Sequence, residues 1–315
     1  MARKSSMIGN RNGRTRVRGL LLCLGVFFAA STPGGSAAAE WQPCAQGIEL
    51  RLTPEQPTQG NLVLVEVRSP FPLASLRGRW KNQRLRFWRA GNPASIQRAL
   101  LGVDLDLPPG RSVLTLAARR DTGERFGCSA LLTVGKGEFA LERLQVPERF
   151  VELSPADRAR ARREGERLRR LWTTASARAL WQGGFRRPLE GVEAAGNFGR
   201  RRVLNDQPRS PHGGEDFRAP AGTPVHAAQG GRVVLADELF FSGNTVVLDH
   251  GLGLYTFYGH LESLGVKERE VVEAGALVGR VGATGRVTGA HLHWAVRLNA
   301  ARVNPLDLPA LLARQ

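Results

Sequence analysis

Two short motifs in the C-terminal third of this 315-residue chain bring together side chains that bind metals. In the first, His212 and Asp216 lie four residues apart, and the two glycines between them allow the backbone to turn so that both side chains converge. In the second, His291 and His293 lie at positions i and i+2, which on a β-strand places both rings on one face. Two histidines and one carboxylate are ligands of a tetrahedral catalytic zinc whose fourth position holds water. The spacing alone leaves open which of His291 and His293 would bind the metal.

The distribution of the other histidines supports a site in this region. All six histidines follow residue 211, and the remaining ones are His226, His250 and His260. A single His-x-His pair is often explained by packing or chance, but here both motifs occur in one compact region. The chain has no His-Glu-x-x-His helix, which excludes the thermolysin-type arrangement. His250 precedes a glycine at the end of a predicted strand, where we expect it to bond to the backbone.

The region that carries these motifs is predicted to be a β domain. Twenty of the 37 glycines lie between residues 183 and 289, which indicates many tight turns. Leu292 and Trp294 should point away from the two histidines of the second motif. Hydrophobic patterns predict strands at residues 231–236, 244–250, 254–261, 277–281 and 292–297.

Residues 40–150 are predicted to form a separate antiparallel β-sandwich. Its short strands, divided by Gly, Pro and Asn turn signals, favour an immunoglobulin-like topology. This region contains no histidine and no acidic cluster, so we expect it to regulate or position the site. Apolar alternation or β-branched runs predict strands at residues 48–52, 62–67, 76–80, 85–88, 103–107, 112–117 and 128–134.

A helix over residues 154–182 is predicted within the linker, residues 151–185. Ser154 is a helix N-cap followed by proline at the first helical position, and Gly183 ends the helix. Trp172 and Ala179 belong to its apolar face, which arginines surround. We interpret the helix as a solvated connector packed on one side, the alternative being a basic stripe that contacts an anionic polymer. The fold class is therefore mostly β, with a connecting helix before a C-terminal antiparallel β domain over residues 186–315.

The order of motifs over residues 195–307 resembles the lysostaphin/LytM-type zinc metalloendopeptidase domain. The first half of the pattern comprises His212-x-Gly214-x-Asp216-Phe217, Ala219-Pro220-x-Gly222-Thr223-Pro224-Val225 and Gly230-Gly231-Arg232-Val233-Val234. The second half comprises Asn244-Thr245-Val246-Val247, His250-Gly251, Tyr258-Gly259-His260-Leu261, Thr284-Gly285, Thr288-Gly289 and His291-Leu292-His293-Trp294. The resemblance does not extend to residues 40–150.

This resemblance implies a role for each of five residues. It implies that His212, Asp216 and His293 hold one Zn²⁺ per chain in a groove of the β domain. It also implies that His260 and His291 stay unligated beside the metal. In such enzymes the zinc polarises the scissile carbonyl or the attacking water, while the free histidines orient that water, transfer protons and stabilise the oxyanion.

Four neighbouring residues carry further expectations. Tyr258 should share a face with the histidine two residues later and line the substrate groove, with ordinary strand packing as the alternative. Ala295 stands where the family often has glutamate, which should tune the site. Glu215 is expected to serve a surface role. Asn205 is a candidate inhibitory plug, since latent relatives can use an upstream asparagine to fill the open zinc position.

The N-terminal segment predicts export. Basic residues precede an apolar stretch at residues 19–31, and Ala37-Ala38-Ala39 resembles a cleavage site, so residues 1–39 are expected to be a signal peptide, with an uncleaved anchor as the alternative. No later segment is predicted to insert stably in a membrane. Cys44 and Cys128 would then be the two cysteines of the mature chain, and we predict a disulfide between them. These features predict a periplasmic or secreted protein of the cell envelope.

Composition and motifs together favour a hydrolase of the bacterial cell wall. The net charge of +17 would attract any polyanion, but no aromatic-basic interleaving or nucleic-acid-binding motif appears, so we expect no nucleic-acid partner. The resemblance implies cleavage of peptide cross-links in peptidoglycan, with stem peptides as the partner. No segment like a glycine-bridge-binding domain follows the last motif, which favours a D,D-endopeptidase. The alternative is an inactive LytM-like protein that binds the wall or activates an amidase, and the oligomeric state is open.

Overall fold

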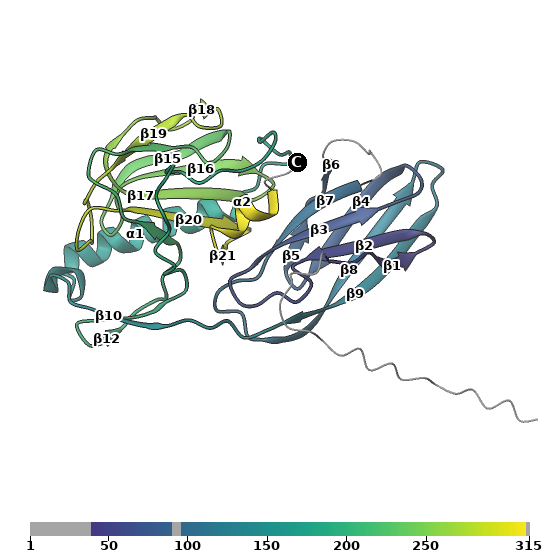
Figure 1. Ribbon diagram of the computed structural model, residues 1–315, viewed down its shortest axis with the longest axis horizontal. Coiled ribbons are helices and arrows are strands. Elements are labelled where there is room, and N and C mark those ends of the chain that lie inside the picture. The colour runs from purple at the N-terminus through teal and green to yellow at the C-terminus, as the bar shows by residue number, and fades with distance from the viewer. Residues whose placement is uncertain (1–38, 90–95, 313–315) are drawn as a thin grey trace, which may run out of the picture. The chain divides into compact units, whose positions relative to one another are not determined.

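The structure is a computed structural model that describes residues 39–89 and 96–312, and these residues form a mostly β protein. The predicted signal peptide falls outside the described residues except at residue 39. Nine N-terminal strands form two antiparallel sheets, with the orders β1-β2-β3-β7-β6 and β5-β4-β8-β9 (Figure 1). The strands are β1 (Gln42–Ala45), β2 (Ile48–Thr53), β3 (Leu62–Arg68), β4 (Leu73–Trp80), β5 (Gln83–Leu85), β6 (Trp88–Arg89), β7 (Ile96–Gly102), β8 (Gly110–Arg120) and β9 (Arg125–Val134).

The two N-terminal sheets enclose one hydrophobic core, as the alternation in their sequences predicts. In β8, Leu114 and Leu116 are buried while their neighbours along the strand are exposed. These side chains share a core with Val63 and Val65 of β3 in the facing sheet. The sheets therefore pack as a sandwich. The predicted disulfide between Cys44 and Cys128 is confirmed: it joins β1 to β9, with 5.5 Å between the two Cα atoms.

Strand β3 is buried on both faces, which explains its continuous apolar run. Val63 and Val65 face the sandwich core, whereas Leu62 and Leu64 belong to the core of the C-terminal domain. The backbone N–H of Leu62 also donates to a carboxylate oxygen of Asp307 at 2.9 Å. The sandwich is thus in direct contact with the C-terminal end of the chain.

The strand predicted at residues 103–107 is wrong, because the strand of this region is β7, which ends at Gly102. Residues 104–107 form a turn instead. The Asp104 side chain accepts a hydrogen bond from the backbone N–H of Asp106 at 2.9 Å, and the Asp104 carbonyl accepts from Leu107. Its carboxylate also binds the guanidinium of Arg302. Local side-chain bonding therefore replaces the predicted ladder.

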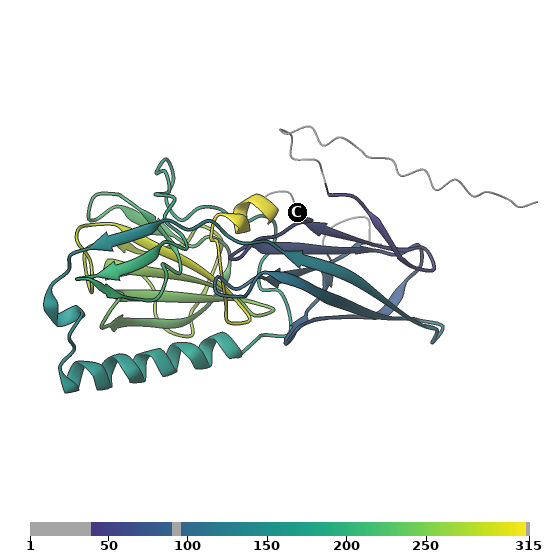
Figure 2. The same ribbon diagram turned by 90° about the horizontal axis from the view of Figure 1, so that it is seen from below.

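The helix α1 (Pro155–Thr173) begins where predicted but ends nine residues early. Ser154 accepts a hydrogen bond from the backbone of Asp157 and caps its N-terminus. At the C-terminus Thr174 is extended, and Ala179 pairs with Gly251 as an isolated β-bridge. Pairing with the C-terminal sheet therefore replaces the last predicted turns of helix. Figure 2 shows α1 running along that sheet, where Trp172 packs against Tyr255 at 5.3 Å between ring centroids.

The C-terminal domain is built on a nine-stranded sheet. Its main path is β13-β20-β17-β16-β15-β18; β19 pairs with β14 and β17, and β21 pairs with β20. The five long strands match the five predicted ones. The elements are β13 (Glu215–Phe217), β14 (Pro224–His226), β15 (Gly231–Leu239), β16 (Gly243–Gly251), β17 (Leu254–Leu264), β18 (Val271–Val272), β19 (Leu277–Val281), β20 (Leu292–Leu298), β21 (Ala301–Val303) and α2 (Asp307–Leu312).

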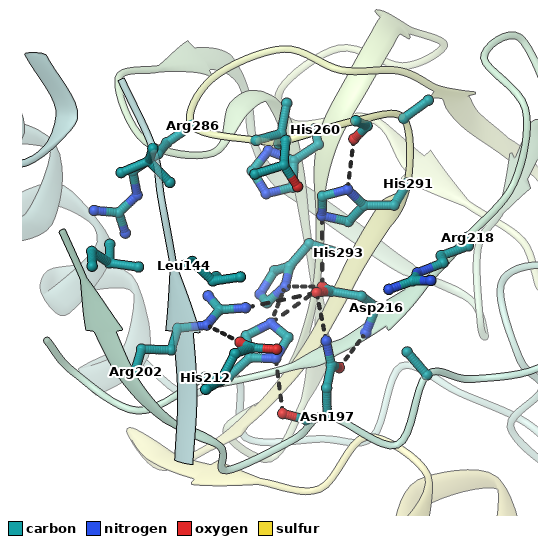
Figure 3. A pocket seen from close by; sticks show the side chains of 18 residues that line it. Leu144, Asn197, Arg202, His212, Asp216, Arg218, His260, Arg286, His291 and His293 are labelled. Atoms are coloured by element: carbon teal, nitrogen blue, oxygen red, sulfur yellow. Dashed lines mark hydrogen bonds and ion pairs between the residues drawn. The ribbon is translucent and has the colours of Figure 1, made fainter. Parts of the chain in front are cut away.

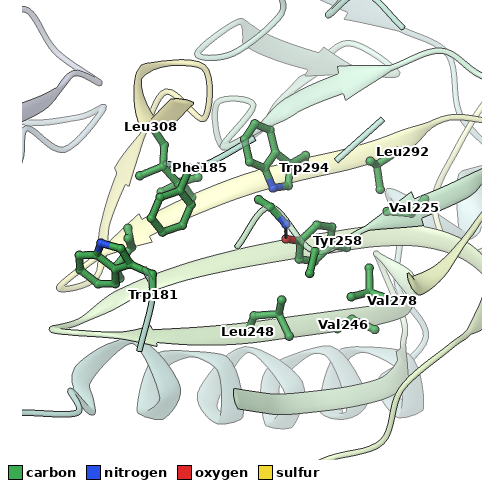
Figure 4. Close-up of a cluster of buried hydrophobic side chains, with 14 of the residues drawn as sticks. Trp181, Phe185, Val225, Val246, Leu248, Tyr258, Val278, Leu292, Trp294 and Leu308 are labelled. Atoms are coloured by element: carbon green, nitrogen blue, oxygen red, sulfur yellow. Dashed lines mark hydrogen bonds between the residues drawn. The ribbon is translucent and has the colours of Figure 1, made fainter. Parts of the chain in front are cut away.

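One face of this sheet carries the main core, and the other carries the candidate site and α1. Leu292 and Trp294 of β20 are buried in the core together with Tyr258 and Leu248, as Figure 4 shows. His293 and Ala295 alternate with them and face the opposite side, where Ala295 packs in the apolar cluster that contains Trp172 of α1. The two faces of β20 thus separate packing from chemistry.

A small sheet links the segments before and after α1. It contains β10 (Leu141–Leu144), β11 (Arg201–Leu204) and β12 (Gln207–Pro208), and β10 and β11 run parallel. A 3₁₀ turn, η1 (Glu148–Phe150), follows β10. In the part of the chain that is described, no helix is long and apolar enough to cross a membrane.

Candidate active site

Three neighbouring strands place the predicted site residues side by side. In the register between β13 and β20, Asp216 is directly opposite His293. In the register between β20 and β17, His293 is directly opposite Gly259, which precedes His260. The sheet therefore brings residues more than 75 positions apart in the sequence to one point.

Gly214 is needed in the first motif because it lies against the His293 ring. A Cβ at this position would meet the backbone oxygen of Trp294 at 2.6 Å and the His293 ring at 2.7 Å. The glycine therefore allows close approach of the two strands, whereas the sequence suggested that it permits a sharp turn.

Three predicted metal ligands converge. The Nδ1 atom of His293 lies 2.8 Å from Oδ1 of Asp216 and 2.9 Å from Nε2 of His212. The same Asp216 oxygen lies 3.2 Å from Nε2 of His212. Figure 3 shows the three side chains pointing toward one another at the centre of the groove. Among the described residues, His212, Asp216 and His293 form a group whose atoms lie close enough together to hold a metal ion.

Asn197, which the sequence did not single out, positions two of these three residues. Its side-chain amide donates to Oδ2 of Asp216 at 2.8 Å, and its side-chain oxygen accepts from the backbone of Asp216 at 3.0 Å. Its backbone carbonyl accepts from Nδ1 of His212 at 3.0 Å, which leaves Nε2 of that ring free to coordinate. The signal was one asparagine 15 residues before the motif, too weak to recognise without the fold.

Glu215 is not a surface residue, contrary to the prediction. Its side chain is 1% exposed, and its carboxylate oxygens accept hydrogen bonds from the backbone N–H groups of Asn197 and Phe198 at 3.1 and 3.2 Å. The reason is the alternation of β13, which turns Glu215 to the face opposite Asp216 and toward the loop that carries Asn197. Glu215 thus holds the loop that carries Asn197, and Asn197 in turn bonds to Asp216 and His212.

His260 reaches the site through a β-bulge. Between β16 and β17 the register shifts so that two residues of β17, Gly259 and His260, oppose one residue of β16. The backbone of His260 is left-handed, with φ of 63°. Its Nδ1 donates to the carbonyl of Thr284 at 2.9 Å, and the ring centroid lies 4.8 Å from that of His291. Both histidines line the same groove as the three candidate ligands.

The same bulge explains why the prediction for Tyr258 as a groove residue is wrong. Without the bulge, Tyr258 and His260 would share a face; with it, Tyr258 points into the core and is 0% exposed. Its hydroxyl accepts a hydrogen bond from the backbone of Ala228 at 2.9 Å. Burial raises the pKa of Tyr258 to about 12. The alternative of ordinary strand packing is correct.

Asn205 does not plug the site in this structure. Its side-chain oxygen accepts from the backbone N–H of Val146 at 2.9 Å, and its amide donates to the Val146 carbonyl at 3.0 Å. Both polar groups are therefore used to hold the end of β11 to the segment after β10. Val146 itself lines the groove, so this contact places part of the linker at its edge.

The two other histidines lie outside the site. His250 is 0% exposed, its Nδ1 donates to the Gly230 carbonyl at 2.8 Å, and burial lowers its pKa to about 4. His226 bonds to the carbonyl of Gly275. Neither lines the groove, as the sequence led us to expect for His250.

The electrostatics of the site suit a metal ion. Burial lowers the pKa of His293 to about 4 and that of His260 to about 3. For Asp216 burial acts to raise the pKa, but hydrogen bonds from His212 and His293 outweigh it and hold that pKa well below its usual range. At neutral pH the His293 ring is thus neutral and the Asp216 carboxylate is charged, which are the forms of these two residues that coordinate metals.

The groove around these residues has a volume of about 380 Å³. Its remaining walls include Leu144 and Arg202 of the linker sheet, Arg218 directly after β13, and Arg286 of the loop between β19 and β20. Figure 3 shows Arg202 and Arg286 on one side of His293 and Arg218 on the other. Three arginines thus line the groove beside the candidate ligands.

The domain combines an antiparallel sheet, a His-Asp-His group formed by two adjacent strands and the segment before β13, and two further histidines beside that group, as in a metallopeptidase. Residues 210–305 match the model of peptidase family M23. This chain therefore carries a domain of peptidase family M23, the lysostaphin/LytM type, over those residues.

Relatives and a solved structure agree with this assignment. The chain is 38% identical over 138 residues to the peptidoglycan DD-endopeptidase ShyC of Vibrio cholerae, covering 42% of this chain and 32% of that protein. It is 40% identical over 97 residues to the DD-carboxypeptidase/endopeptidase Mpg of Neisseria meningitidis, covering 31% of this chain and 22% of that protein. The chain thus spans a third or less of these curated relatives.

A crystal structure described as peptidase M23 from Pseudomonas aeruginosa matches more of the molecule. It is 28% identical with a TM-score of 0.57, covering 82% of this chain and 96% of that one. The fold before the M23 domain therefore also has a counterpart among solved structures.

Proposed function

We propose that this protein is an exported zinc metalloendopeptidase that hydrolyses peptide cross-links of bacterial peptidoglycan, of the D,D-endopeptidase type. The observation that carries the proposal is the complete five-residue site: three converging candidate ligand atoms and two further histidines, His260 and His291, in one groove. The names of the relatives from Vibrio and Neisseria support the substrate class and the bond.

In this proposal His212, Asp216 and His293 hold one zinc ion. Two imidazole nitrogens and one carboxylate oxygen are a zinc donor set, and all three atoms lie within 4.8 Å of one another. When bound, zinc would act as a Lewis acid toward the scissile carbonyl and its attacking water. Asn197 keeps His212 and Asp216 in the orientation that coordination requires.

His260 and His291 carry the proton transfers. Each donates its Nδ1–H to a backbone carbonyl, of Thr284 and Gly289 respectively, at 2.9 Å. This fixes the tautomer, so Nε2 of each ring is available to accept a proton from water and return one to the leaving amine. The strained backbone of His260 is consistent with a position set by function.

The remaining regions complete the proposal. Residues 1–39 direct export to the periplasm or beyond, the 40–150 sandwich of immunoglobulin-like type positions or regulates the enzyme, residues 151–185 connect, and residues 186–315 catalyse. The disulfide between Cys44 and Cys128 supports an oxidising envelope compartment. The pairing of connector arginines, such as Arg160 with Glu164 and Arg162 with Glu166, supports the solvated-connector interpretation of α1.

An inactive wall-binding or amidase-activating role is the alternative. It predicts loss of ligands or of the free histidines, whereas this chain retains all five in one groove. Digestion of purified sacculi separates the two possibilities. The wild-type protein with zinc should release un-cross-linked muropeptides, identified by mass spectrometry, from diaminopimelate-type sacculi, and the H291A variant should release few. Absence of any new muropeptide from the zinc-loaded wild type would refute the proposal.

A further inference from the structure

The groove holds more positive charge than its own residues neutralise. It is lined by Arg202, Arg218 and Arg286 but by only two carboxylates, those of Glu142 and Asp216. Glu142 is already used, because it binds Arg202 through Nε at 3.1 Å. Within residues 39–89 and 96–312, Arg218 and Arg286 have no acidic partner.

Arg286 is the unusual one of these two, because it is partly buried. Its backbone N–H donates to the carbonyl of Phe241 at 2.8 Å, and its guanidinium lies 4.4 Å from the centroid of the Phe241 ring. Burial lowers its pKa to about 10, and Arg202 and Arg209 act in the same direction. Burying a guanidinium near other cations without a carboxylate partner costs free energy, and binding of an anion would offset this cost.

The position of Arg286 relates it to the reacting groups. Arg286, His260 and His293 line one pocket of about 170 Å³ together with Phe241. The loop that carries Arg286 is the loop whose Thr284 carbonyl holds His260. An anion bound at Arg286 would therefore lie beside the histidines that carry the proposed proton transfers.

We infer that Arg286 forms a carboxylate subsite that selects stem peptides with a free carboxylate beside the scissile bond. This inference rests on the proposed function and specifies its substrate class. In a D-alanyl-diaminopimelate cross-link, the carbon attached to the scissile nitrogen bears a carboxylate. The guanidinium fork of Arg286 fits that group in two parallel hydrogen bonds, and Lys would fit it less well.

The test compares two purified cross-linked muropeptide dimers that differ only in this group, one with the free carboxylate and one with the carboxamide. Wild-type enzyme should cleave the free-carboxylate dimer at least about tenfold more efficiently in kcat/KM, the scale of one charge-assisted pair. R286Q should lose this preference by slowing on the free-carboxylate dimer, mostly through KM, and R286K should retain part of it. The matched control R163Q removes an exposed arginine of α1 and should keep the full preference.

Zinc content and thermal unfolding of each variant show whether it is folded and loaded. Equal cleavage of the two dimers by wild type, or an unchanged preference in R286Q, would overturn the subsite while leaving the proposed function intact. Failure of wild type to cleave either dimer would instead count against the proposed function.

A second, independent feature is an arginine-rich face on the sandwich. Strands β4, β5, β8 and β9 contain no Asp or Glu. Along these strands, exposed residues alternate with residues that are buried in the sandwich core. None of the arginines on this exposed face forms an ion pair in the part of the chain that is described. This arginine face comprises Arg77, Arg79, Arg84, Arg111, Arg119 and Arg125.

We propose that the arginine face docks the enzyme on the anionic stem peptides of peptidoglycan. Charge complementarity supports a polyanion, and the side chains between the arginines are small or aliphatic, such as Thr115, Ser129 and Leu131. The exposed positions of these strands carry no aromatic side chain of the kind that anchors proteins at membrane interfaces, so a hydrated polymer is favoured over a bilayer. This proposal also assumes the wall as substrate, but it concerns binding without cleavage.

Sedimentation with insoluble sacculi tests the arginine face, using the H291A background so that the substrate survives. Substituting Arg77, Arg79, Arg111 and Arg119 by Gln should weaken binding at low salt at least about tenfold, and added salt should weaken the parent similarly. Four exposed α1 arginines, Arg158, Arg163, Arg169 and Arg170, changed to Gln provide a control of equal charge. Equal losses in both variants, or binding to vesicles of anionic lipid in place of sacculi, would overturn the assignment.

Discussion

Removing the Asn197 side chain should weaken zinc binding without unfolding the protein. N197A deletes two hydrogen bonds to Asp216, of 2.8 and 3.0 Å, while the backbone carbonyl that binds His212 remains. Loss of such an outer partner of a ligand typically lowers metal affinity 10- to 100-fold, or about 1.4–2.7 kcal/mol. We expect the Kd for zinc to rise by that factor.

Competition with a chromogenic chelator at pH 7.5 measures this Kd directly. N304A is a suitable control, since it also removes a side-chain hydrogen bond, from the backbone N–H of Leu306 at 3.1 Å, at a residue that does not line the groove. Unfolding curves for both variants should show that each is folded. A folded N197A protein with a zinc Kd within twofold of wild type would refute the role assigned to Asn197.

Three further predictions concern Glu215, His250 and the disulfide. In E215Q, one of the two buried backbone N–H groups that Glu215 accepts from would face an amide NH₂ and lose its acceptor. Chemical denaturation should therefore show a free energy of unfolding lower by about 1–3 kcal/mol, and a decrease below about 0.5 kcal/mol would contradict this prediction. The pKa of His250 is about 6.5 in the unfolded state and about 4 in the folded state, so between those pH values the unfolded state binds more protons. Acidification through this range should therefore lower the stability of wild type by about 3 kcal/mol relative to H250Q, and parallel pH profiles of stability for the two proteins would contradict this prediction. Joint replacement of Cys44 and Cys128 by Ser opens a loop of sequence separation 84 and should lower the free energy of unfolding by about 4 kcal/mol on the chain-entropy model, whereas an unchanged midpoint would show that the bridge adds nothing.

The long strands of the C-terminal domain were predictable because each one is half-buried and alternates. In β20, Leu292 and Trp294 enter the core while His293 faces the site, and this pattern is visible in the sequence. The five candidate site residues could be proposed for a different reason: four of them are histidines, which all follow residue 211, and the order of the motifs resembles a known family. The structure adds that Nδ1 of His293 lies 2.8 Å from Oδ1 of Asp216, whereas Nε2 of His291 lies 3.8 Å from the same oxygen.

The features that escaped prediction depend on contacts distant in sequence. The bulge at His260 arises from pairing with β16, so Tyr258 could not be assigned to the core from its spacing. Helix α1 stops early because Ala179 pairs with Gly251, and no local signal marks Thr173 as its end. Asn197 gains its importance only when β13 brings Asp216 beside it.

The division of roles between His291 and His293 is the central claim, and zinc analysis of two matched variants tests it most directly. The two residues belong to one His-Leu-His segment, and each of the variants H291A and H293A removes one imidazole ring from it. Because Nδ1 of His293 lies among the ligand atoms, whereas Nδ1 of His291 donates to Gly289, only H293A should lose bound zinc. The account predicts near-stoichiometric zinc but turnover lowered about 100-fold or more in H291A, and neither zinc nor activity in H293A. Retention of zinc and activity by H293A, or a folded but zinc-free H291A, would contradict it.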